Sequence, residues 1–482
     1  MKAILPRNGV TATGRTVRAW RFLVALMLVF VSTAVFSSAV VAQVTDCSQL
    51  TFTDQLGTLP DGTPYGMRKP SNWNGVLIND LDYVVNRDSQ RNCYWLGQGY
   101  ALSGTNRHPL RTFQYDPAQE INNLLTVIDL FEQTHGKPTR IIQYGNSGGG
   151  FVGLGIAELH PDRVDGVVAG CAHEQVPLMN MMFDGWFVLQ ALLAPDLQIA
   201  NYTDLDQVSA AAAKWSEVIK AAQNTPLGRA RIALAVTIGQ WPAWSSTTNP
   251  PPDPHDAHAL QNAMFETVFA DAGQPGGQSR FMSEHAGGSA TPRQLSWNTG
   301  IDYRKFFEDG DADYKRAVRE LYREAAADLK SDLAIVNAEP RISADPAAVE
   351  FWLQPGRTVN GTPQVPTLRL HTTGDNIVPP EITDGYKQKM RENHGKQRLY
   401  RTAFVERGSH CTFSVSENAA AVETLLERIE TGRWPSTKPK RLNELALDLV
   451  PSSTTLFTDY NPVPFNRPDN APPSPPKHGH DD

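Results

Sequence analysis

The stretch Ile141–Gly150 constrains the fold of this chain more than any other part of the sequence. An apolar, β-prone run reaches Gly145-Asn146-Ser147-Gly148-Gly149, and a helical pattern of small residues follows from 151 to 160. The turn between them is tight enough to push the serine into a sparsely populated backbone region, which works only if its neighbours lack bulk. Two glycines provide this, so the sequence predicts a strand, a sharp turn and a helix, with an exposed serine hydroxyl.

Strands and helices alternate around this stretch. The predicted elements are strands near 75–78, 164–170, 366–373 and 398–405, and helices near 116–134, 380–392 and 415–431; a short helix from Tyr94 leads into a further strand before Asn106. Asp116 and Pro117 are typical of a helix start, as N-cap and first helical residue. This alternation indicates an α/β chain with a largely parallel sheet covered by helices on both faces.

A Gly-x-Ser-x-Gly turn between a strand and a helix resembles the nucleophile elbow of the α/β-hydrolase superfamily. The resemblance implies the α/β-hydrolase fold, with a catalytic acid after a late strand and a histidine after the last one. Asp375 follows the strand ending at Thr373, and His410 follows the final strand. We therefore expect Ser147 to be the nucleophile, His410 the general base and then acid, and Asp375 the group that orients it.

Each partner of the serine has an alternative interpretation. Asp375 could be a turn residue, and His410 could be a packed loop histidine. Glu406 is the reserve acid, although it lies close to the strand end, and His371 is expected to be buried in the sheet.

The resemblance also implies an oxyanion hole, with one N–H from Gly148 and a second from the loop after an early strand. Superfamily members often carry a His-Gly pair in that loop, whereas this chain has Asn79-Asp80-Leu81. A backbone amide near Asp80 or Leu81 could serve, because the chemistry needs an N–H rather than a particular side chain. His173 and Asn146 are candidate substrate contacts, with a structural role as the alternative for His173.

Four cysteines, Cys47, Cys93, Cys171 and Cys411, follow the N-terminal segment, and an even count in an exported chain suggests two disulfides with three possible connectivities. Their spacing matches no zinc motif. Cys411 beside the predicted histidine is similar to the arrangement in tannases and fungal feruloyl esterases, although Asn146 replaces their cysteine next to the serine. That partial resemblance implies the pairs Cys171–Cys411 and Cys47–Cys93. Two free buried cysteines are the alternative.

The alternation breaks near Ala172, and the chain is mostly helical until about Gly361. The expected helices lie near 183–196, 206–222, 226–239, 256–272 and 312–336. We interpret residues 173–360 as a helical lid inserted between two halves of the hydrolase core, 43–172 and 361–435. Most of the tryptophans of this segment should be core, and one or two could line a pocket. Residues 436–482 are predicted to be an extended Pro-rich tail.

The N-terminal segment 1–42 has a basic region, an apolar run from Phe22 to about Phe36 and small residues near Ala42, as in a secretory signal peptide. An uncleaved membrane anchor is the alternative. Removing the five basic residues of this segment leaves 39 basic and 51 acidic side chains, a net charge of −12. Such an acidic surface argues against nucleic acid or anionic membrane as a partner.

Together these features predict a secreted or periplasmic serine hydrolase that cleaves carboxylic esters, of small or oligomeric substrates, through an acyl-enzyme. It would need neither cofactor nor metal; the run Asp253–His258 matches no known ligand set. A peptidase or amidase similar to the secreted prolyl-peptidase branch is one alternative, and a non-catalytic binding protein on the same fold is another. The sequence leaves the oligomeric state open.

Overall fold

The structure of the chain, a computed structural model, describes residues 46–109, 115–269 and 293–473. All of these belong to the second of the two compact units into which the chain divides, Gln43–Asp482. The predicted export segment, 1–42, lies outside the described residues, so the choice between signal peptide and anchor stays a prediction.

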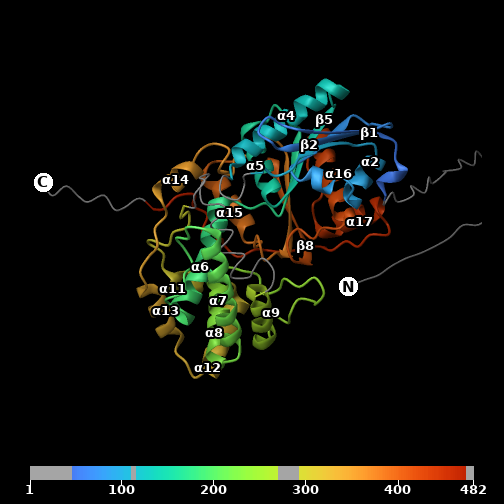
Figure 1. The fold of residues 1–482 in the computed structure, drawn as a ribbon. Helices are drawn as coiled ribbons and strands as arrows, with labels where there is room; N and C mark the ends of the chain where they lie inside the picture. The colour runs from blue at the N-terminus through green and yellow to red at the C-terminus, as the bar shows by residue number, and fades with distance from the viewer. Residues whose placement is uncertain (1–45, 110–114, 270–292, 474–482) are drawn as a thin grey trace, which may run out of the picture. The chain divides into compact units, whose positions relative to one another are not determined.

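The described residues contain one nine-stranded sheet with the order β1-β2-β4-β3-β5-β6-β7-β8-β9 (Figure 1). Its strands are β1 (Phe52–Thr58), β2 (Pro64–Pro70), β3 (Val76–Asp80), β4 (Ala101–Thr105), β5 (Arg140–Asn146), β6 (Gly166–Gly170), β7 (Thr367–Gly374), β8 (Tyr400–Gly408) and β9 (Phe457–Thr458). The strands from β3 to β8 pair in parallel, whereas β2 pairs antiparallel with β4, and β9 antiparallel with β8. This order, with its antiparallel second strand, is that of the α/β-hydrolase fold and confirms the predicted fold class.

Helices cover both faces of the sheet, as the alternating pattern predicts (Figure 1). On one face α4 (Pro117–His135) and α5 (Gly148–Leu159) bury residues such as Leu124 and Ile156. On the other face α2 (Gln90–Gly97), α16 (Val415–Thr431) and α17 (Pro439–Leu449) pack with Leu425 and Leu442 in a second cluster. The remaining short elements of this part are η1 (Cys47–Gln49), α1 (Tyr83–Asn86), α15 (Ile382–Glu392) and η3 (Gln397–Leu399).

The start signals read from the sequence set the helix boundaries. Asp116 accepts a hydrogen bond from the Ala118 N–H, and Pro117 is the first residue of α4. At the start of α16, Ser414 and Glu417 form a reciprocal capping box. Both helices therefore begin where their local sequence satisfies the free N–H groups of the first turn.

Between β6 and β7 the described chain is helical, and we call this part the helical segment. It contains α6 (Gln175–Leu193), α7 (Leu205–Gln223), α8 (Pro226–Ile238), α9 (Ala257–Phe269), α11 (Tyr303–Asp309), α12 (Ala312–Glu324), α13 (Leu329–Ala338) and α14 (Pro346–Trp352). The single helix expected over 312–336 is two helices. Asp328 caps α13 by accepting from the Lys330 N–H, and Ala326 has a left-handed φ of 50° that ends the preceding helix.

The helical segment is joined to the sheet by shared apolar packing. Its buried side chains belong to the same hydrophobic cluster as those between the sheet and α4. The tryptophans at 186, 215, 241, 297 and 352 are all buried, as expected of core residues, whereas Trp244 is only half-buried. Among the described helices, α6 alone is long and apolar enough to cross a membrane, but 83% of its apolar window is buried inside the fold.

One part of the chain carries elements that were not predicted, and another contradicts the sequence predictions. The region from 47 to 74 contains the β1–β2 hairpin, closed by the turn-forming residues 59–63. The extended tail predicted over 436–482 is wrong as far as the structure describes it, because α17 and β9 lie within it. Beyond them Arg467 is buried, donating to Asp184 at 3.1 and 3.2 Å and to the Trp297 carbonyl at 2.6 Å. This ion pair, the β8–β9 pairing and hydrogen bonds such as those of Asn466 with Gln240 and Asn470 with Lys389 hold this segment, and such long-range contacts leave no periodic signal in the sequence.

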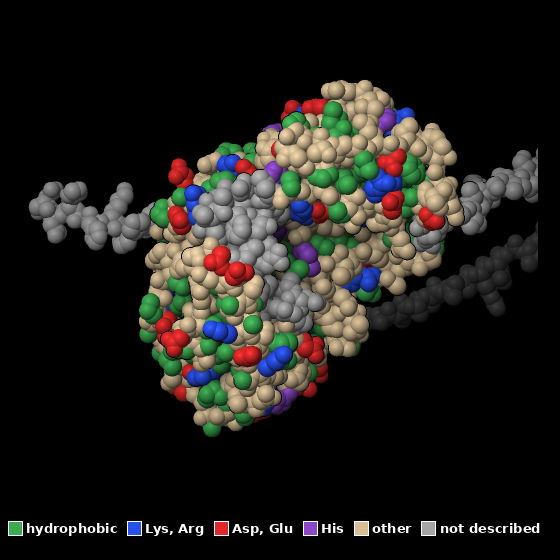
Figure 2. Space-filling view, in the orientation of Figure 1, with side chains coloured by type: hydrophobic (Ala, Val, Ile, Leu, Met, Phe, Trp, Pro, Cys, Tyr) green, Lys and Arg blue, Asp and Glu red, His purple; other side chains and the backbone are tan. Residues whose placement is uncertain are grey.

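The described surface carries charges of both signs. On the face drawn in Figure 2, acidic and basic side chains are interspersed rather than gathered into a patch of one sign.

We expect Arg467→Ala to destabilise the fold by about 3–5 kcal/mol at pH 8, because Asp184 is left buried without its partner. Burial already raises the pKa of Asp184 to about 6, against the opposing charge of Arg467. Below that pH the carboxyl is largely protonated, so the loss should be smaller at pH 5. Urea unfolding followed by tryptophan fluorescence measures both values. Arg304→Ala, at an exposed position, is the control, and its free energy of unfolding should stay within about 0.5 kcal/mol of the unmodified protein. Equal losses of stability in the two variants would contradict the prediction.

Candidate active site

Ser147 lies in the sharp turn between β5 and α5, as predicted. Its backbone has φ 57° and ψ −121°, a region that non-glycine residues rarely adopt. A Cβ at Gly145 would lie 2.4 Å from the carbonyl carbon of Gly149, so no side chain fits there. The glycines on either side therefore make the turn possible.

The neighbouring strand holds this turn in place. The Ser147 N–H donates to the Gly170 carbonyl at the end of β6, at 2.8 Å, and the Ser147 carbonyl accepts from Phe151 within α5. A Cβ at Gly150 would lie 2.8 Å from the same Gly170 oxygen. The serine is half-buried at the carboxyl end of the sheet, where open α/β sheets bind their ligands.

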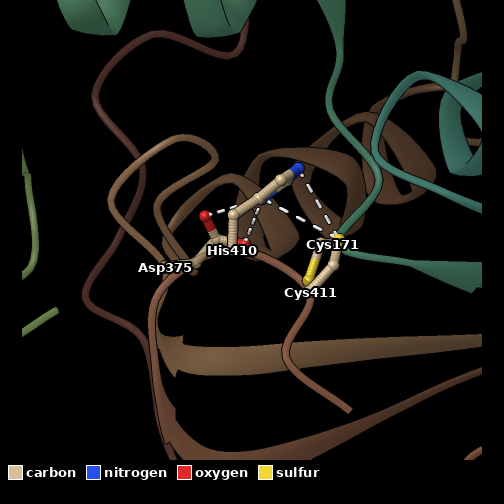
Figure 3. Close-up of side chains that lie close together, drawn as sticks. All are labelled: Cys171, Asp375, His410 and Cys411. Carbon is tan, nitrogen blue, oxygen red and sulfur yellow. Dashed lines mark hydrogen bonds and ion pairs between the residues drawn. The ribbon is translucent and has the colours of Figure 1, made fainter. Parts of the chain in front are cut away.

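Asp375 and His410 form a hydrogen-bonded pair at the same end of the sheet (Figure 3). The His410 Nδ1 lies 2.9 and 2.8 Å from the two carboxylate oxygens of Asp375. Asp375 is fully buried and also accepts from the N–H groups of Ile377 and Val378. Burial by itself would raise the pKa of Asp375, but the adjacent His410 and these donors hold it below its usual value. The carboxylate is therefore ionised and can orient the imidazole.

This pairing sets the tautomer of His410. With the Nδ1–H donated to the carboxylate, the Nε2 atom carries a lone pair that can accept a proton. His371 lies in β7 as expected, with its Nε2 bonded to the Val378 carbonyl at 2.7 Å. Burial lowers the pKa of His371 to about 4, so it stays neutral beside Asp375. Glu406, the alternative acid, is exposed on β8, so Asp375 is the residue that the structure pairs with the histidine.

The sulfur of Cys411 lies between His410 and the turn that holds Ser147. The Cys411 Sγ is 3.6 Å from the His410 Nε2 and 3.9 Å from the Gly170 carbonyl, which also accepts from the Ser147 N–H. Among the described contacts there is no hydrogen bond between the Ser147 hydroxyl and His410. The structure thus brings Asp375 and His410 together directly, whereas Ser147 makes no described hydrogen bond with them. Catalytic hydrogen bonds are often long or misaligned without substrate and tighten when it binds.

The predicted oxyanion donors lie beside the serine. Gly148 is the first residue of α5, so its N–H has no acceptor within the helix and lies at the positive end of the helix dipole. Leu81 approaches from the other side, with its Cβ 3.3 Å from the Cβ position of Gly149. Asp80 is the last residue of β3, paired with Gly104 and Tyr144 in the sheet. Leu81 is therefore the better placed of the two candidates.

A bridge between the Leu81 loop and the serine turn was not predicted from the sequence. Arg107, after β4, donates two hydrogen bonds to the Asp82 carboxylate at 2.6 and 2.5 Å. Its Nη2 also reaches the Asn146 carbonyl at 3.4 Å. The bridge ties the residue after Leu81 to the residue before Ser147. No motif surrounds Arg107, so the sequence offered no signal for it.

The two candidate substrate contacts differ in exposure. Asn146 is half-buried, and its side-chain oxygen accepts from the Tyr144 hydroxyl at 3.2 Å. His173 is buried, with its ring 4.9 Å from that of Phe151. This packing favours the structural interpretation of His173.

One of the two predicted disulfides is present. Cys47 and Cys93 are bonded, whereas Cys171 and Cys411 are free thiols, so the second predicted bridge is wrong. The Cys171 sulfur contacts the Thr372 hydroxyl at 3.7 Å, and the Cys411 sulfur faces the imidazole rather than forming a bond. Burial raises the pKa of both thiols, that of Cys411 well above its usual value. Both are therefore protonated and weak nucleophiles.

The helical segment contacts the ends of the strands that precede Asp375 and His410. A Cβ at Gly374 would lie 2.6 Å from the Trp244 carbonyl, and one at Gly408 would lie 1.9 Å from the Ser246 carbonyl. Trp244 also lines a cavity of about 410 Å³ together with Gly408 and Thr412, which flank the His410 loop. The backbone of the helical segment thus lies directly against this loop.

Comparison with known proteins places the chain in a family. The chain is 45% identical over 417 residues to o-phthalyl amidase of Xanthobacter agilis, a match that covers 82% of this chain and 91% of that protein. The chain belongs to the family of this amidase. It is a hydrolase of the esterase and amidase type. No family model matches the sequence.

Solved structures with a similar fold include two esterases of Aspergillus oryzae. Feruloyl esterase B shares 17% identity with a TM-score of 0.38, covering 80% of this chain and 82% of that chain. The second esterase shares 13% identity with a TM-score of 0.38, covering 79% of this chain and 80% of that chain.

We expect Arg107→Ala to lower kcat by about 10–100-fold with a smaller effect on KM, because the Leu81 loop loses its tie to the serine turn. Arg107→Lys should recover part of the rate, since an ammonium group can still bridge one Asp82 oxygen and the Asn146 carbonyl.

Arg163→Ala is the matched control for this variant. Arg163 is paired with Asp129, and its side chain is 27% exposed, against 26% for Arg107, but it lies outside the site. Steady-state kinetics on the three variants measures the effect. A kcat for Arg107→Ala equal to that of the control would show that the bridge has no role in positioning.

Proposed function

We propose that this hydrolase cleaves amides and esters of aromatic carboxylic acids by acyl transfer to Ser147. The observation that carries the proposal is the Asp375–His410 pair, bonded at 2.8 and 2.9 Å, beside a serine in a strained strand-to-helix turn. A serine hydroxyl needs a base and a group that orients the base, and these residues supply both.

In the proposed reaction Ser147 Oγ attacks the carbonyl carbon while its proton passes to His410 Nε2. Negative charge collects on the carbonyl oxygen, which the N–H groups of Gly148 and Leu81 bind. His410 then protonates the leaving amine or alcohol, and the acyl group stays on Ser147. Water, deprotonated by His410, releases the acid and restores the serine.

The choice of acyl group rests on the family. The relative acts, by its name, on o-phthalyl groups, and an o-phthalyl group is a benzoyl group with an adjacent carboxylate. The predicted ester hydrolysis follows the same steps with an easier leaving group, so both substrate classes fit the proposal.

Two further proposals concern the role of the helical segment and the cellular location of the protein. We propose that the helical segment acts as a lid, supported by its contacts with Gly374 and Gly408 on either side of the catalytic loops. We also propose export to the periplasm or the medium, supported by the Cys47–Cys93 disulfide, since such bonds persist in oxidising compartments.

We expect a fluorophosphonate probe to label the folded protein and Ser147→Ala to abolish the labelling. Ser409→Gly is the matched control, because it removes a hydroxyl next to His410 and glycine adopts the φ of 67° found there without strain. Labelling that persists in Ser147→Ala would disprove the assignment of the nucleophile.

We expect Asp375→Asn to lower kcat by about 10³–10⁴-fold, because the amide no longer fixes the Nδ1–H tautomer of His410. Steady-state kinetics measures this loss.

The substrate class is tested on the unmodified protein with p-nitroanilides and p-nitrophenyl esters of 2-carboxybenzoic, benzoic and acetic acids. Faster turnover of the two aromatic acyl groups is the expected result, whereas a clear preference for acetyl would contradict the proposed substrate class.

A further inference from the structure

Two thiols and the imidazole of His410 converge at the carboxyl ends of three neighbouring parallel strands. Cys171 directly follows β6, Asp375 follows β7, and His410 and Cys411 follow β8 (Figure 3). One ligand atom from each of these four residues lies within 4.8 Å of the others. No step of the proposed hydrolysis uses either sulfur.

We propose that Cys171, Cys411 and His410 form an inhibitory binding site for a thiophilic divalent metal ion, Zn²⁺ or Cd²⁺. Two thiolates and one imidazole are the donor set that such ions prefer, and they leave a fourth position for water. Cys171 lies far from the adjacent pair His410 and Cys411 in the sequence, so the site has no recognisable metal-binding spacing motif.

The three ligand side chains lie close enough together to bind one tetrahedral ion after they rotate. With Zn–S near 2.3 Å and Zn–N near 2.0–2.1 Å, tetrahedral geometry sets the sulfur and nitrogen about 3.6 Å apart and two sulfurs about 3.8 Å apart. The Cys411 Sγ lies 3.6 Å from the His410 Nε2. The two sulfurs lie within 4.8 Å, so a rotation of one side chain brings them into range.

The surroundings of the imidazole favour binding at its Nε2. Asp375 accepts the Nδ1–H at 2.8 Å, the carboxylate–histidine arrangement that orients metal-binding imidazoles in proteins. The Cys411 sulfur lies beside the ring, 3.6 Å from Nε2 and 3.8 Å from Nδ1, so the imidazole must turn for Nε2 to bind an ion shared with this sulfur. The His410 side chain is 16% exposed, so it is not sealed from solvent.

The bound metal ion would inhibit the enzyme because it occupies the His410 Nε2 lone pair, which must accept the proton of Ser147 during catalysis. Each thiol releases its proton when it binds the ion, and His410 can then no longer accept the proton of Ser147. The inhibitory effect rests on the proposed role of His410, whereas metal binding by the two thiols does not.

The test is a titration of the purified mature protein, without added thiols, with ZnCl₂ and separately with CdCl₂. We expect stoichiometric inhibition by Zn²⁺ that EDTA reverses, no inhibition by Mg²⁺, and a cadmium–thiolate absorption band that saturates at one ion per chain. The absorption band reports binding even if the protein proves inactive on the chosen substrates, so failure of the proposed function and failure of this proposal are separable.

Cys411→Ser and Cys171→Ala should each need at least about 100-fold more Zn²⁺ for half-inhibition, relative to their own uninhibited rates, and should lose most of the cadmium band. Cys411 is half-buried, so that variant tests the site even if the buried Cys171→Ala fails to fold. His255→Ala/His258→Ala is the control, because these exposed histidines beside Asp313 and Glu324 lie outside the proposed site, and their removal should leave inhibition unchanged. Unchanged inhibition in Cys411→Ser, or no free thiol in the unfolded protein, would overturn the proposal.

Discussion

The site depends on the backbone of one residue, Ser147, held at φ 57° between a strand and a helix. That backbone conformation is unfavourable in free energy for a serine. It persists because contacts with the surrounding chain fix it. Gly145 lies too close to the backbone of Gly149 to carry a side chain, and the Gly170 carbonyl accepts the serine N–H. The turn places Ser147 and the first N–H of α5 together at the carboxyl end of β5. Without this turn the other residues of the site would have nothing to act on.

Parallel pairing explains why the remaining groups gather there. Consecutive strands β5 to β8 all end at one edge, so residues that directly follow them become neighbours although they are far apart in the sequence. The helical segment, inserted between β6 and β7, then lies against the loops after β7 and β8. Left-handed backbone recurs at this edge, in Ser147, Cys171, Ser409 and Cys411. Such conformations concentrate at functional sites.

Local signals made much of this predictable. The elbow, the capped start of α4 and the bounds of α16 follow from short-range patterns of glycine, caps and apolar residues, and the resemblance to α/β-hydrolases then indicated Asp375 and His410. Features that depend on contacts between distant residues could not be predicted from such local patterns. The Arg107–Asp82 bridge, the buried Arg467 and the free state of Cys171 arise from contacts between distant residues, and a sequence alone does not encode them in any periodic form.

The central claim is that Ser147, His410 and Asp375 act as one unit, although the Cys411 sulfur lies beside the His410 ring in the present structure and no hydrogen bond between Ser147 and His410 is described. A crystal structure of the protein after reaction with an aryl phosphonate ester tests this most directly. The account predicts phosphorus bonded to Ser147 Oγ, an oxygen bound by the N–H groups of Gly148 and Leu81, and His410 Nε2 turned from Cys411 toward the adduct. An adduct on another residue, or an imidazole that stays out of reach of Ser147, would contradict it.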